Sequence, residues 1–396
     1  MSAQDVVITG IGLLTSLGEG TDAHWQALTE GKFPVLERKK FAPYTVHPLP
    51  ETDWSRQIER RGDQRQMETW QRIGTYTAGL ALADAGMKGD AALVSTMDMI
   101  VAAAGGERDI VVDNQIMAAA RTRNDRDAML NEKLTTELRP TLFLAQLSNL
   151  LAGNISIVHN VTGSSRTFMG EEGAGIAAVK TAHARIRSGQ STHMLVGGAL
   201  NMDYEDGLLN YELGGYLQRD GWSSVWDRKG REGGGLIPGS GGAFLVLEAR
   251  AHAQARGARI YAKLNAIGGD QIHRKVDNLQ KSLSRLMQAV DPRSEAQLAL
   301  SAASGAHLAT EAERAALAER PGLAVRAFSS AIGHLKEAQM PLGLALAALS
   351  VHKGAIMPPL DRTSGAEKAA AGMLTKALVV TAGFHRSEGA ALVSKA

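Results

Sequence analysis

Short apolar runs rich in valine, isoleucine and leucine alternate with alanine-rich segments along almost the entire chain. The first such runs are DVVITGIG near residue 5, DMIVAAAG near 98, THMLVGGAL near 192 and GGAFLVLEA near 241. Short, continuously apolar runs are typical of strands that are covered on both faces, and the alanine-rich segments between them favour helices. The alternation therefore predicts an α/β protein in which helices cover both faces of a buried sheet.

A second set of runs follows in the last third of the chain. Its members are RIYAKLNAIGG near residue 259, LALSAASG near 298, VRAFSSAIG near 325, and the closing pair ALVVTAGFH and GAALVSKA. We predict that the two sets form two copies of one layered unit, divided at about residue 250. With 396 residues, 44% of them hydrophobic, the chain has enough apolar material for two such units.

Charge and composition exclude several classes of function. The 43 basic and 41 acidic residues leave a net charge of +2, so no overall field would attract nucleic acid or a membrane surface. The absence of cysteine excludes disulfides, thiolate metal sites and a cysteine nucleophile. No His, Asp and Glu residues have the spacing of metal ligands, and we expect neither a metal nor a cofactor.

The sequence also lacks the signals of membrane insertion and export. Nowhere do about 18 apolar residues follow one another, which is the length a membrane-spanning helix needs. The N-terminal stretch MSAQDVVITGIG has no basic segment followed by an apolar one, as a signal peptide would. We therefore expect a cytoplasmic protein without a membrane anchor.

Residues 160–189, NVTGSSRTFMGEEGAGIAAVKTAHARIRSG, predict a Gly-Ser-rich turn that leads into a helix. Many enzymes mount a nucleophile at such a strand-to-helix turn, but here Glu172 stands at the turn. The free N–H groups of a first helical turn and the helix dipole stabilise a carboxylate by about 0.3–1 kcal/mol. Glu172 is thus electrostatically favourable at this place, although an acid cannot do the chemistry of a thiolate.

The stretch 107–150 differs from the rest of the chain. Its middle, ARTRNDRDAMLNEKL, is highly charged, whereas its end, LFLAQLSNLLAGNISI, is apolar. We predict that this stretch is an excursion from the body that packs against a large surface, such as a second subunit.

Five segments, in the expected order, resemble landmarks of the β-ketoacyl-acyl-carrier-protein synthases. They are VVITGIGLLTSLG, LSNLLAGNISI, GGGLIPGSGGAFLVLEARAHAQARGARIYAKL, AIGHLKEA and GFHRSEGAALV, and together they span residue 5 to the C-terminus. The resemblance implies the thiolase-like fold, a five-layered αβαβα arrangement of two pseudo-equivalent halves, for which we predict residues 1–250 and 251–396. It also implies a dimer with an extensive interface.

Synthases of this family use a cysteine nucleophile, two histidines and a lysine, and the resemblance transfers these roles to positions of this chain. Counting forward from Gly163, and backward from the Gly-Gly-Ala of residues 197–199, places Glu172 at the nucleophile position. Ser304 or its neighbour falls at the first histidine position, and Ser329 falls at the lysine position. Of the histidine pair, only His334 is retained.

The segment GFHRSEG resembles the family's C-terminal gate beside the active site. Phe384 is retained, whereas His385 and Arg386 replace small residues and should fill or stiffen the gate. We therefore predict a degenerate site in which no residue is catalytic.

Simpler explanations exist for the same residues. Glu172 can be a helix cap, Ser329 a filler, and His334 a structural histidine that holds the turn at Gly333. His307 could swing into the vacant histidine position. An acyl transfer by Ser164 or its neighbour is a poor alternative, because this serine lies upstream of the turn and no general base is positioned beside it.

Chain length factors of type II polyketide synthases are ketosynthase-like, lack the cysteine, and form an obligate heterodimer with an active ketosynthase. The resemblance therefore implies a subunit without independent catalysis. Its partners would be a cysteine-containing β-ketoacyl synthase, an acyl carrier protein, and a growing acyl or polyene chain in a tunnel at the interface. The segments RTFMGEE and HMLVGGAL most resemble the ketosynthase-like subunits of aryl polyene pathways; the factors of aromatic polyketide pathways are the alternative.

A different class of function, decarboxylation of malonyl-carrier protein to supply starter units, is the second hypothesis. Ketosynthases of that class carry Gln in place of the cysteine and stabilise an enolate with two histidines. An ionised Glu172 would repel the enolate, whereas a Glu172 protonated through burial could donate a hydrogen bond to it.

Docking of an acidic acyl carrier protein on this chain would need a basic patch. The segment SRQIERRGDQRQMETWQR supplies arginines at positions 56, 60, 61, 65 and 72, and one continuous helix would bring Arg61, Arg65 and Arg72 to one face. We favour a solvated helix face, because acidic residues alternate with these arginines.

Overall fold

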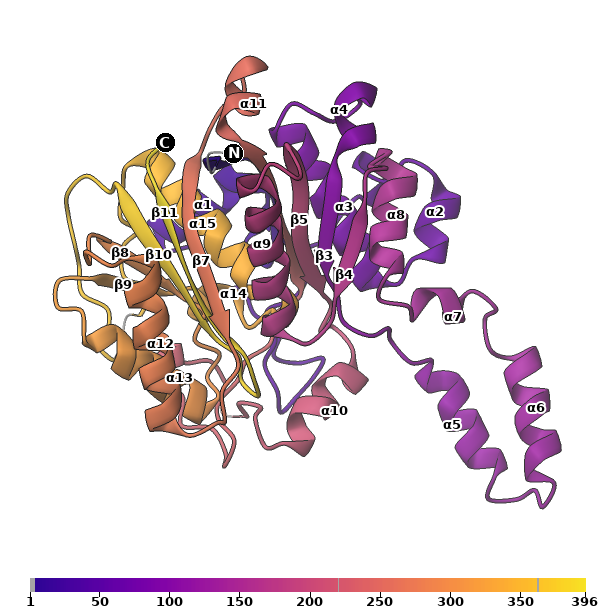
Figure 1. Cartoon of the computed structure of the whole chain (residues 1–396). Helices are drawn as coiled ribbons and strands as arrows, with labels where there is room; N and C mark the ends of the chain where they lie inside the picture. The colour runs from indigo at the N-terminus through magenta and orange to yellow at the C-terminus, as the bar shows by residue number, and fades with distance from the viewer. Residues whose placement is uncertain (1–3, 220, 362) are drawn as a thin grey trace.

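The computed structural model describes residues 4–219, 221–361 and 363–396, and a sheet of 11 strands forms its centre (Figure 1). The strands are β1 (Val6–Thr15), β2 (Gly18–Glu19), β3 (Asp98–Ala102), β4 (Ser165–Phe168), β5 (His193–Leu200), β6 (Gly241–Ala249), β7 (Ala262–Asp270), β8 (Leu298–Ser301), β9 (Ala324–Ala327), β10 (Lys376–Ala382) and β11 (Glu388–Ser394). Every strand expected from the apolar runs is present, which confirms the predicted α/β class.

The strand order is repeated in the two parts of the chain. The first part has the order β4-β3-β5-β6-β1, and the second has β9-β8-β10-β11-β7. When the two-residue strand β2, which pairs only with β1, is left out, both orders read 3-2-4-5-1 with the strands numbered along each part. In each part the first two neighbouring pairs are parallel and the last two are antiparallel. Antiparallel pairing of β1 with β7 joins the two parts into one sheet. This repeated order supports the two pseudo-equivalent halves that we propose as residues 1–250 and 251–396.

Six helices form three layers over the sheet, and 15 α-helices are described in all. They are α1 (Gly20–Glu30), α2 (Arg61–Gln66), α3 (Thr69–Asp84), α4 (Ala91–Thr96), α5 (Ile110–Ala119), α6 (Arg126–Thr136), α7 (Leu142–Ala145), α8 (Leu150–His159), α9 (Glu172–Arg187), α10 (Glu205–Leu213), α11 (Arg250–Ala255), α12 (Val276–Val290), α13 (His307–Ala318), α14 (Ser329–Ile332) and α15 (Gln339–Lys353). Helices α9 and α15 pack together and contact strands of both halves. Helix α3 covers the first half with α8, and α12 covers the second half with α13.

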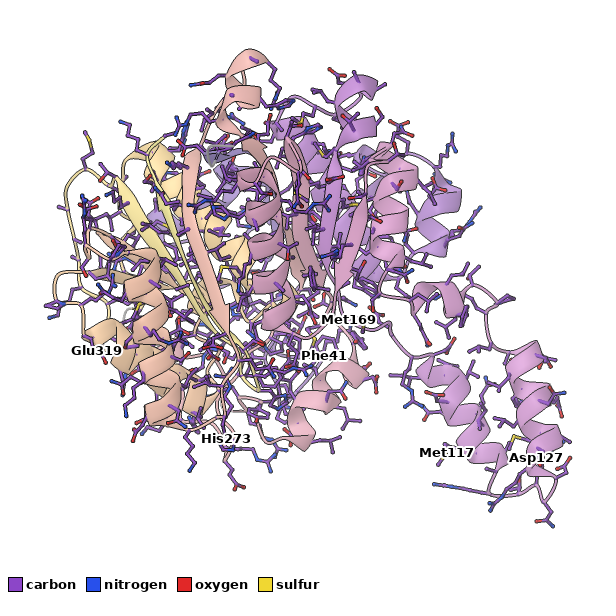
Figure 2. All side chains as sticks on the ribbon, viewed as in Figure 1. Phe41, Met117, Asp127, Met169, His273 and Glu319 are labelled. Carbon is purple, nitrogen blue, oxygen red and sulfur yellow. The ribbon has the colours of Figure 1, made fainter. Side chains whose placement is uncertain are left out.

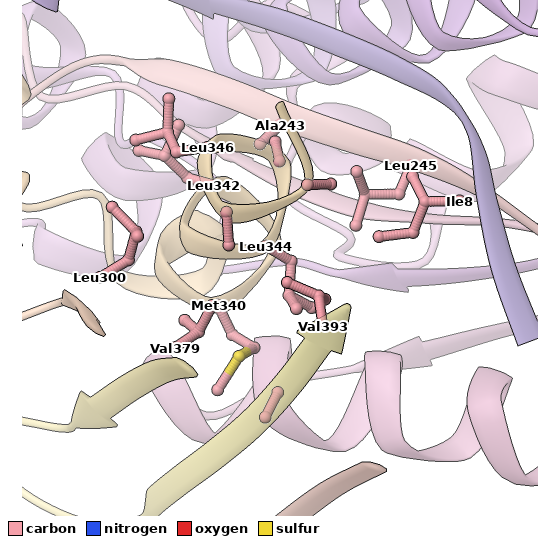
Figure 3. Packing of buried hydrophobic residues seen from close by; sticks show 14 of the residues in the cluster. Ile8, Ala243, Leu245, Leu300, Met340, Leu342, Leu344, Leu346, Val379 and Val393 are labelled. Atoms are coloured by element: carbon pink, nitrogen blue, oxygen red, sulfur yellow. The ribbon is translucent and has the colours of Figure 1, made fainter. Parts of the chain in front are cut away.

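Alternate residues of the strands face the different layers, as expected for strands buried on both faces. In β6, Leu245 packs in the core around α15, whereas Phe244 packs in the core beneath α3. Helix α15 is buried from Gln339 to Val351, and Figure 3 shows its Leu342 and other side chains among residues of β6, β8 and β10. A helix that is apolar on all sides is stable only in such a central place.

Strand β4 is a difference from the sequence prediction, in which residues 160–189 form a Gly-Ser-rich turn that leads into a helix. Ser165 pairs with Met99 of β3, and the parallel ladder continues to Phe168 and Ala102. The short strand has no apolar run because its first two residues are exposed at the edge of the sheet. β4 therefore lacks the apolar run by which the other long strands were predicted.

The stretch 107–150 is an excursion, as predicted. Helices α5 and α6 pack against each other and extend away from the body, as Figure 1 shows. In Figure 2, Met117 and Asp127 lie on this arm, well separated from Phe41 on the body. We call residues 107–148, which contain α5, α6 and α7, the arm.

Candidate functional site

Glu172 is the first residue of α9 and is 1% exposed. The turn between β4 and α9 brings it there through Glu171, whose φ of 59° and ψ of −139° are rare for a residue with a side chain. Such a conformation costs roughly 1–3 kcal/mol and persists only where the surroundings enforce it. Within α9, a Cβ atom added at Gly175 would lie 2.4 Å from the Glu337 carbonyl oxygen. The glycine therefore allows α9 to approach the segment that precedes α15.

Glu172 and His334 form a fully buried pair. The His334 Nε2 atom lies 2.6 Å from the Glu172 Oε1 atom, and since a carboxylate oxygen only accepts, Nε2 carries the hydrogen. The backbone N–H of Phe384 donates to the same oxygen at 3.2 Å. The structure thus brings together Glu172, His334 and Phe384, three of the residues predicted from the resemblance. His334 and Phe384 follow Glu172 by 162 and 212 positions along the chain.

Burial raises the pKa of Glu172, but the charge and hydrogen bond of His334 and two backbone amides act in the opposite direction. The balance holds the pKa of this carboxyl below its ordinary value. Glu172 is therefore an ionised carboxylate at neutral pH. A protonated Glu172, the form that the decarboxylase hypothesis needs, is not favoured by these surroundings.

A second buried carboxyl, Glu337, lies three residues after His334. Its Oε2 atom has no hydrogen-bond partner among the described residues. Burial raises the pKa of Glu337 to about 7, and the charges of Glu172 and Glu171 act in the same direction. The neighbouring Lys336 ammonium lies 4.5 Å from the centroid of the Tyr211 ring, a cation–π contact. The surroundings of the pair thus hold more ionisable groups than the resemblance indicated.

The loop 383–387 closes over the pair. The Phe384 ring packs against the rings of Tyr211, Tyr216 and His334, with centroid distances of 5.3, 5.2 and 5.9 Å. The side chains of His385 and Arg386 approach the Glu171 carboxylate, with closest distances of 3.5 and 3.9 Å. These contacts attach the loop to α10 and to the turn before α9.

The same loop is also attached from the side of β7. Arg274 donates from Nε to the His385 carbonyl at 3.1 Å and from Nη2 to the Ser387 carbonyl at 2.7 Å. A Cβ atom added at Gly383 would lie 2.0 Å from the Arg386 carbonyl, so the close turn requires glycine at this position. The loop is therefore held from three directions.

We predict that a thiol placed at position 172 reacts slowly, because the loop must open first. The chain contains no cysteine, so Glu172→Cys and Met169→Cys each introduce a single thiol. Met169 is 64% exposed and is the matched control. Alkylation of Glu172→Cys should be at least about tenfold slower than that of Met169→Cys, which corresponds to an opening cost of about 1.4 kcal/mol or more. Equal rates in two folded variants would contradict a closed loop.

Ser304 and Ser329, the other two predicted positions, lie elsewhere in the site. Both are fully buried, and their backbone carbonyls accept hydrogen bonds from one guanidinium, that of Arg228, each at 3.4 Å. The Ser304 hydroxyl accepts from the Ala306 amide, and the Ser329 hydroxyl accepts from Gln339. Neither serine has a hydrogen bond with Glu172 or His334 among the described residues. Their roles as replaced catalytic residues remain a proposal.

His307 and the arginine-rich segment have different surroundings from those expected. His307 begins α13 and its Nε2 atom lies 2.9 Å from the Arg231 carbonyl oxygen, so it does not join the Glu172 pair. The expectation of one continuous helix over the arginine-rich segment is wrong. Arg61 and Arg65 belong to α2, whereas Arg72 belongs to α3, which starts after a capping box formed by Glu68. The cap separates the two helices.

Sequence reasoning missed Glu337, Lys336 and Arg228. The charged pair Lys-Glu directly after the Gly-His-Leu of residues 333–335 interrupts an apolar run, and this was an available signal for the first two. Nothing in the loop around Arg228 distinguished it from the neighbouring Lys229 and Arg231. In the part of the chain that the structure describes, no three His, Asp or Glu residues lie together in a way that could hold a metal ion.

None of the helices that the structure describes is long and apolar enough to cross a membrane.

The sheet order, the central α9 and α15, and the site at the start of α9 define a thiolase-like fold. Residues 3–253 match the family model of the β-ketoacyl synthase N-terminal domain, and the chain therefore belongs to the β-ketoacyl synthase family. Relatives include 3-oxoacyl-[acyl-carrier-protein] synthase 2 of Vibrio harveyi, with 26% identity over 69% of this chain and 65% of the relative. The ketoacyl synthase beta subunit of the tetracenomycin polyketide synthase of Streptomyces glaucescens has 26% identity over 65% of this chain and 62% of its own length.

The chain thus spans less than two thirds of the length of these two relatives. Among solved structures, the ishigamide ketosynthase/chain length factor is similar over its full length and the full length of this chain. The TM-score is 0.80 and the sequence identity is 20%, so this similarity establishes the fold.

Proposed function

We propose that this chain is a chain length factor, a ketosynthase-like subunit that pairs with an active, cysteine-containing β-ketoacyl synthase. The observation that carries the proposal is the buried Glu172–His334 pair at the start of α9, in a chain without cysteine. A carboxylate at the nucleophile position cannot hold an acyl chain as a thioester, since acyl transfer to it would give a reactive mixed anhydride, and its charge would repel the malonyl carboxylate. This chain would then contribute a surface and a tunnel wall, while the partner condenses acyl chains that are carried on acyl carrier protein.

The arm and the edge of the sheet support a large interface. Isolated helices as short as α5 and α6 are marginal in water, so they need a surface to pack on. Six exposed apolar residues lie on the arm: Val111, Met117, Leu130, Leu134, Phe143 and Leu144. Ile157 of α8 and Met169 after β4 are exposed on the body. One edge of β4 has no strand beside it among the described residues, and such an edge can pair with a strand of another chain. An obligate interface of about 2,000–5,000 Å² would cover these features.

The particular pathway is a finer part of the proposal. The segments RTFMGEE and HMLVGGAL favour an aryl polyene pathway, in which the product is a conjugated polyene, over an aromatic polyketide pathway. The ketosynthase/chain length factor title of the structural neighbour supports the general class only.

Co-expression with the cysteine-containing ketosynthase of the same pathway tests the proposal. We expect a one-to-one complex by size exclusion, elongation of acyl chains on carrier protein by the complex, and no activity of this chain alone. Carbon dioxide release from malonyl-carrier protein by this chain alone, lost in a folded Glu172→Ala variant, would instead establish the decarboxylase. The ionised state of Glu172 weighs against that outcome.

An aspartate on the arm should weaken the complex. Phe143 is 69% exposed on α7, and Met373 is 68% exposed on the other half of the molecule, so Met373→Asp is a matched control. We expect Phe143→Asp to weaken association about 30-fold or more, as for a hot spot worth about 2 kcal/mol, and Met373→Asp to leave it unchanged. Equal affinities of the two variants, measured by analytical ultracentrifugation, would place the interface elsewhere.

A further inference from the structure

Arg228 is a buried cation without a counter-ion. It follows the short 3-10 helix Val225–Asp227 and is 6% exposed. Its guanidinium donates from Nε to the Ser223 carbonyl at 3.1 Å, and from Nη1 and Nη2 to the Ser304 and Ser329 carbonyls. Carbonyl groups satisfy hydrogen bonds but do not neutralise the charge. Among the described residues, no carboxylate forms an ion pair with this guanidinium.

The electrostatic effects around Arg228 are those of an uncompensated positive charge. Burial lowers the pKa of Arg228 to about 9, and no acidic group opposes this shift. Burial and the charge of Arg228 together lower the pKa of the neighbouring His47 to about 3, so His47 is neutral. A buried charge is costly unless a group of opposite sign compensates it. A negatively charged group beside Arg228 would therefore stabilise this part of the protein.

A cavity of about 310 Å³ adjoins Arg228 and is large enough for such a group. Trp226 lines it from the 3-10 helix, and His307, Thr310 and Arg314 line it from α13. The Thr310 hydroxyl accepts from the Gly305 amide at 3.0 Å and keeps its own hydrogen for donation. The cavity walls thus offer donors as well as charge.

The field inside the cavity is positive. Arg314 is exposed at the mouth, and α13, a helix of 12 residues, points its N-terminus toward the cavity through its first residue, His307. A helix N-terminus favours negative charge. Glu311 is the one acidic residue in the described lining, and it is exposed rather than buried against Arg228.

We propose that this cavity binds a small oxyanion, a carboxylate or a phosphate group, held by Arg228, by Arg314 at the mouth and by the Thr310 hydroxyl. The planar fork of a guanidinium suits both kinds of oxyanion. Binding would fix the loops at Ser304 and Ser329, which Arg228 already links. The proposal does not depend on the function assigned above, since none of these residues contacts the Glu172 pair.

The test uses the full chain, with sodium phosphate and sodium malonate titrated separately and the ionic strength held constant with sodium chloride. A ligand that binds only the folded state stabilises it by RT ln(1 + [L]/Kd), so the melting temperature keeps rising with ligand concentration above Kd. We expect such a rise with at least one anion, and a saturable change in tryptophan fluorescence at fixed temperature because Trp226 lines the cavity. Phosphate alone would indicate a phosphate monoester, and malonate alone a carboxylate; both results support the site.

Variants separate the site from general ion effects. Arg314→Glu should weaken binding at least about tenfold, because it reverses a charge at the mouth. Arg293→Glu makes the same charge change at an exposed arginine outside the cavity and should leave binding unchanged. The conservative Arg228→Lys should fold and lose most of the affinity. No saturable response to either anion, or equal responses in the two Glu variants, would overturn the proposal.

Discussion

Replacing Glu172 with alanine is expected to lower the free energy of unfolding by about 3–5 kcal/mol. The substitution leaves the buried Nε2–H group of His334 without its acceptor, and an unsatisfied buried donor costs about 1–3 kcal/mol. It also removes the acceptor of the Phe384 N–H group. Urea denaturation of the wild type and the variant at neutral pH measures the difference.

Two controls isolate the pair from the loss of packing. Glu172→Gln keeps an acceptor for His334 and for the Phe384 amide, and should cost only about 1–2 kcal/mol. The double variant Glu172→Met with His334→Leu replaces the pair with apolar groups of similar volume, and should recover most of the stability. A double variant that is as unstable as the sum of its singles would contradict a coupled pair.

The pH dependence of this first effect has a defined sign. Since the pKa of Glu172 in the folded protein lies below its ordinary value of 4.5, its contribution is present above about pH 4.5 and is lost as the pH falls through the lower, folded-state pKa. The difference in stability between the wild type and Glu172→Gln should therefore shrink on acidification. A constant difference down to pH 3 would argue against an ionised Glu172.

The apolar runs predicted the long strands because a strand that is buried on both faces consists mainly of apolar residues. The order of the strands in the sheet cannot be predicted in this way, because no local sequence pattern specifies it. Strand β7, for example, pairs with β11, more than a hundred residues further along the chain. β4 was missed for a related reason: Ser165 and Arg166 are exposed, and the strand exists because β3 offers an edge.

The candidate site was predictable only where the resemblance supplied the positions. Glu172, His334 and Phe384 come from three distant segments, and no local pattern indicates that they meet. Arg228 could not be predicted from the sequence, because it donates hydrogen bonds to backbone carbonyls of two other segments, at Ser304 and Ser329. The arm is the opposite case, since its charged middle and apolar end predicted an excursion, and an excursion is what the chain forms.

Glu337 should make the protein less stable as the pH rises from about 5 to 8. Its pKa is about 7 in the folded state, against an ordinary value of 4.5, because burial disfavours its charged form. The folded state therefore binds the proton more tightly than the unfolded state. This tighter proton binding contributes about 3 kcal/mol to the free energy of unfolding, for a shift of this size. The contribution is fully present below pH 4.5 and is lost as the pH rises through 7.

The variant Glu337→Gln isolates this carboxyl, because an amide of the same shape does not ionise. We expect it to match the wild type within about 1 kcal/mol at pH 5 and to be more stable by about 3 kcal/mol at pH 8.5. Glu313, whose pKa burial raises to about 8, is present in both proteins and cancels in the difference. Urea denaturation at several pH values measures the two curves. Parallel curves would mean that Glu337 is already ionised, and that Lys336 or water compensates its charge within the buried site.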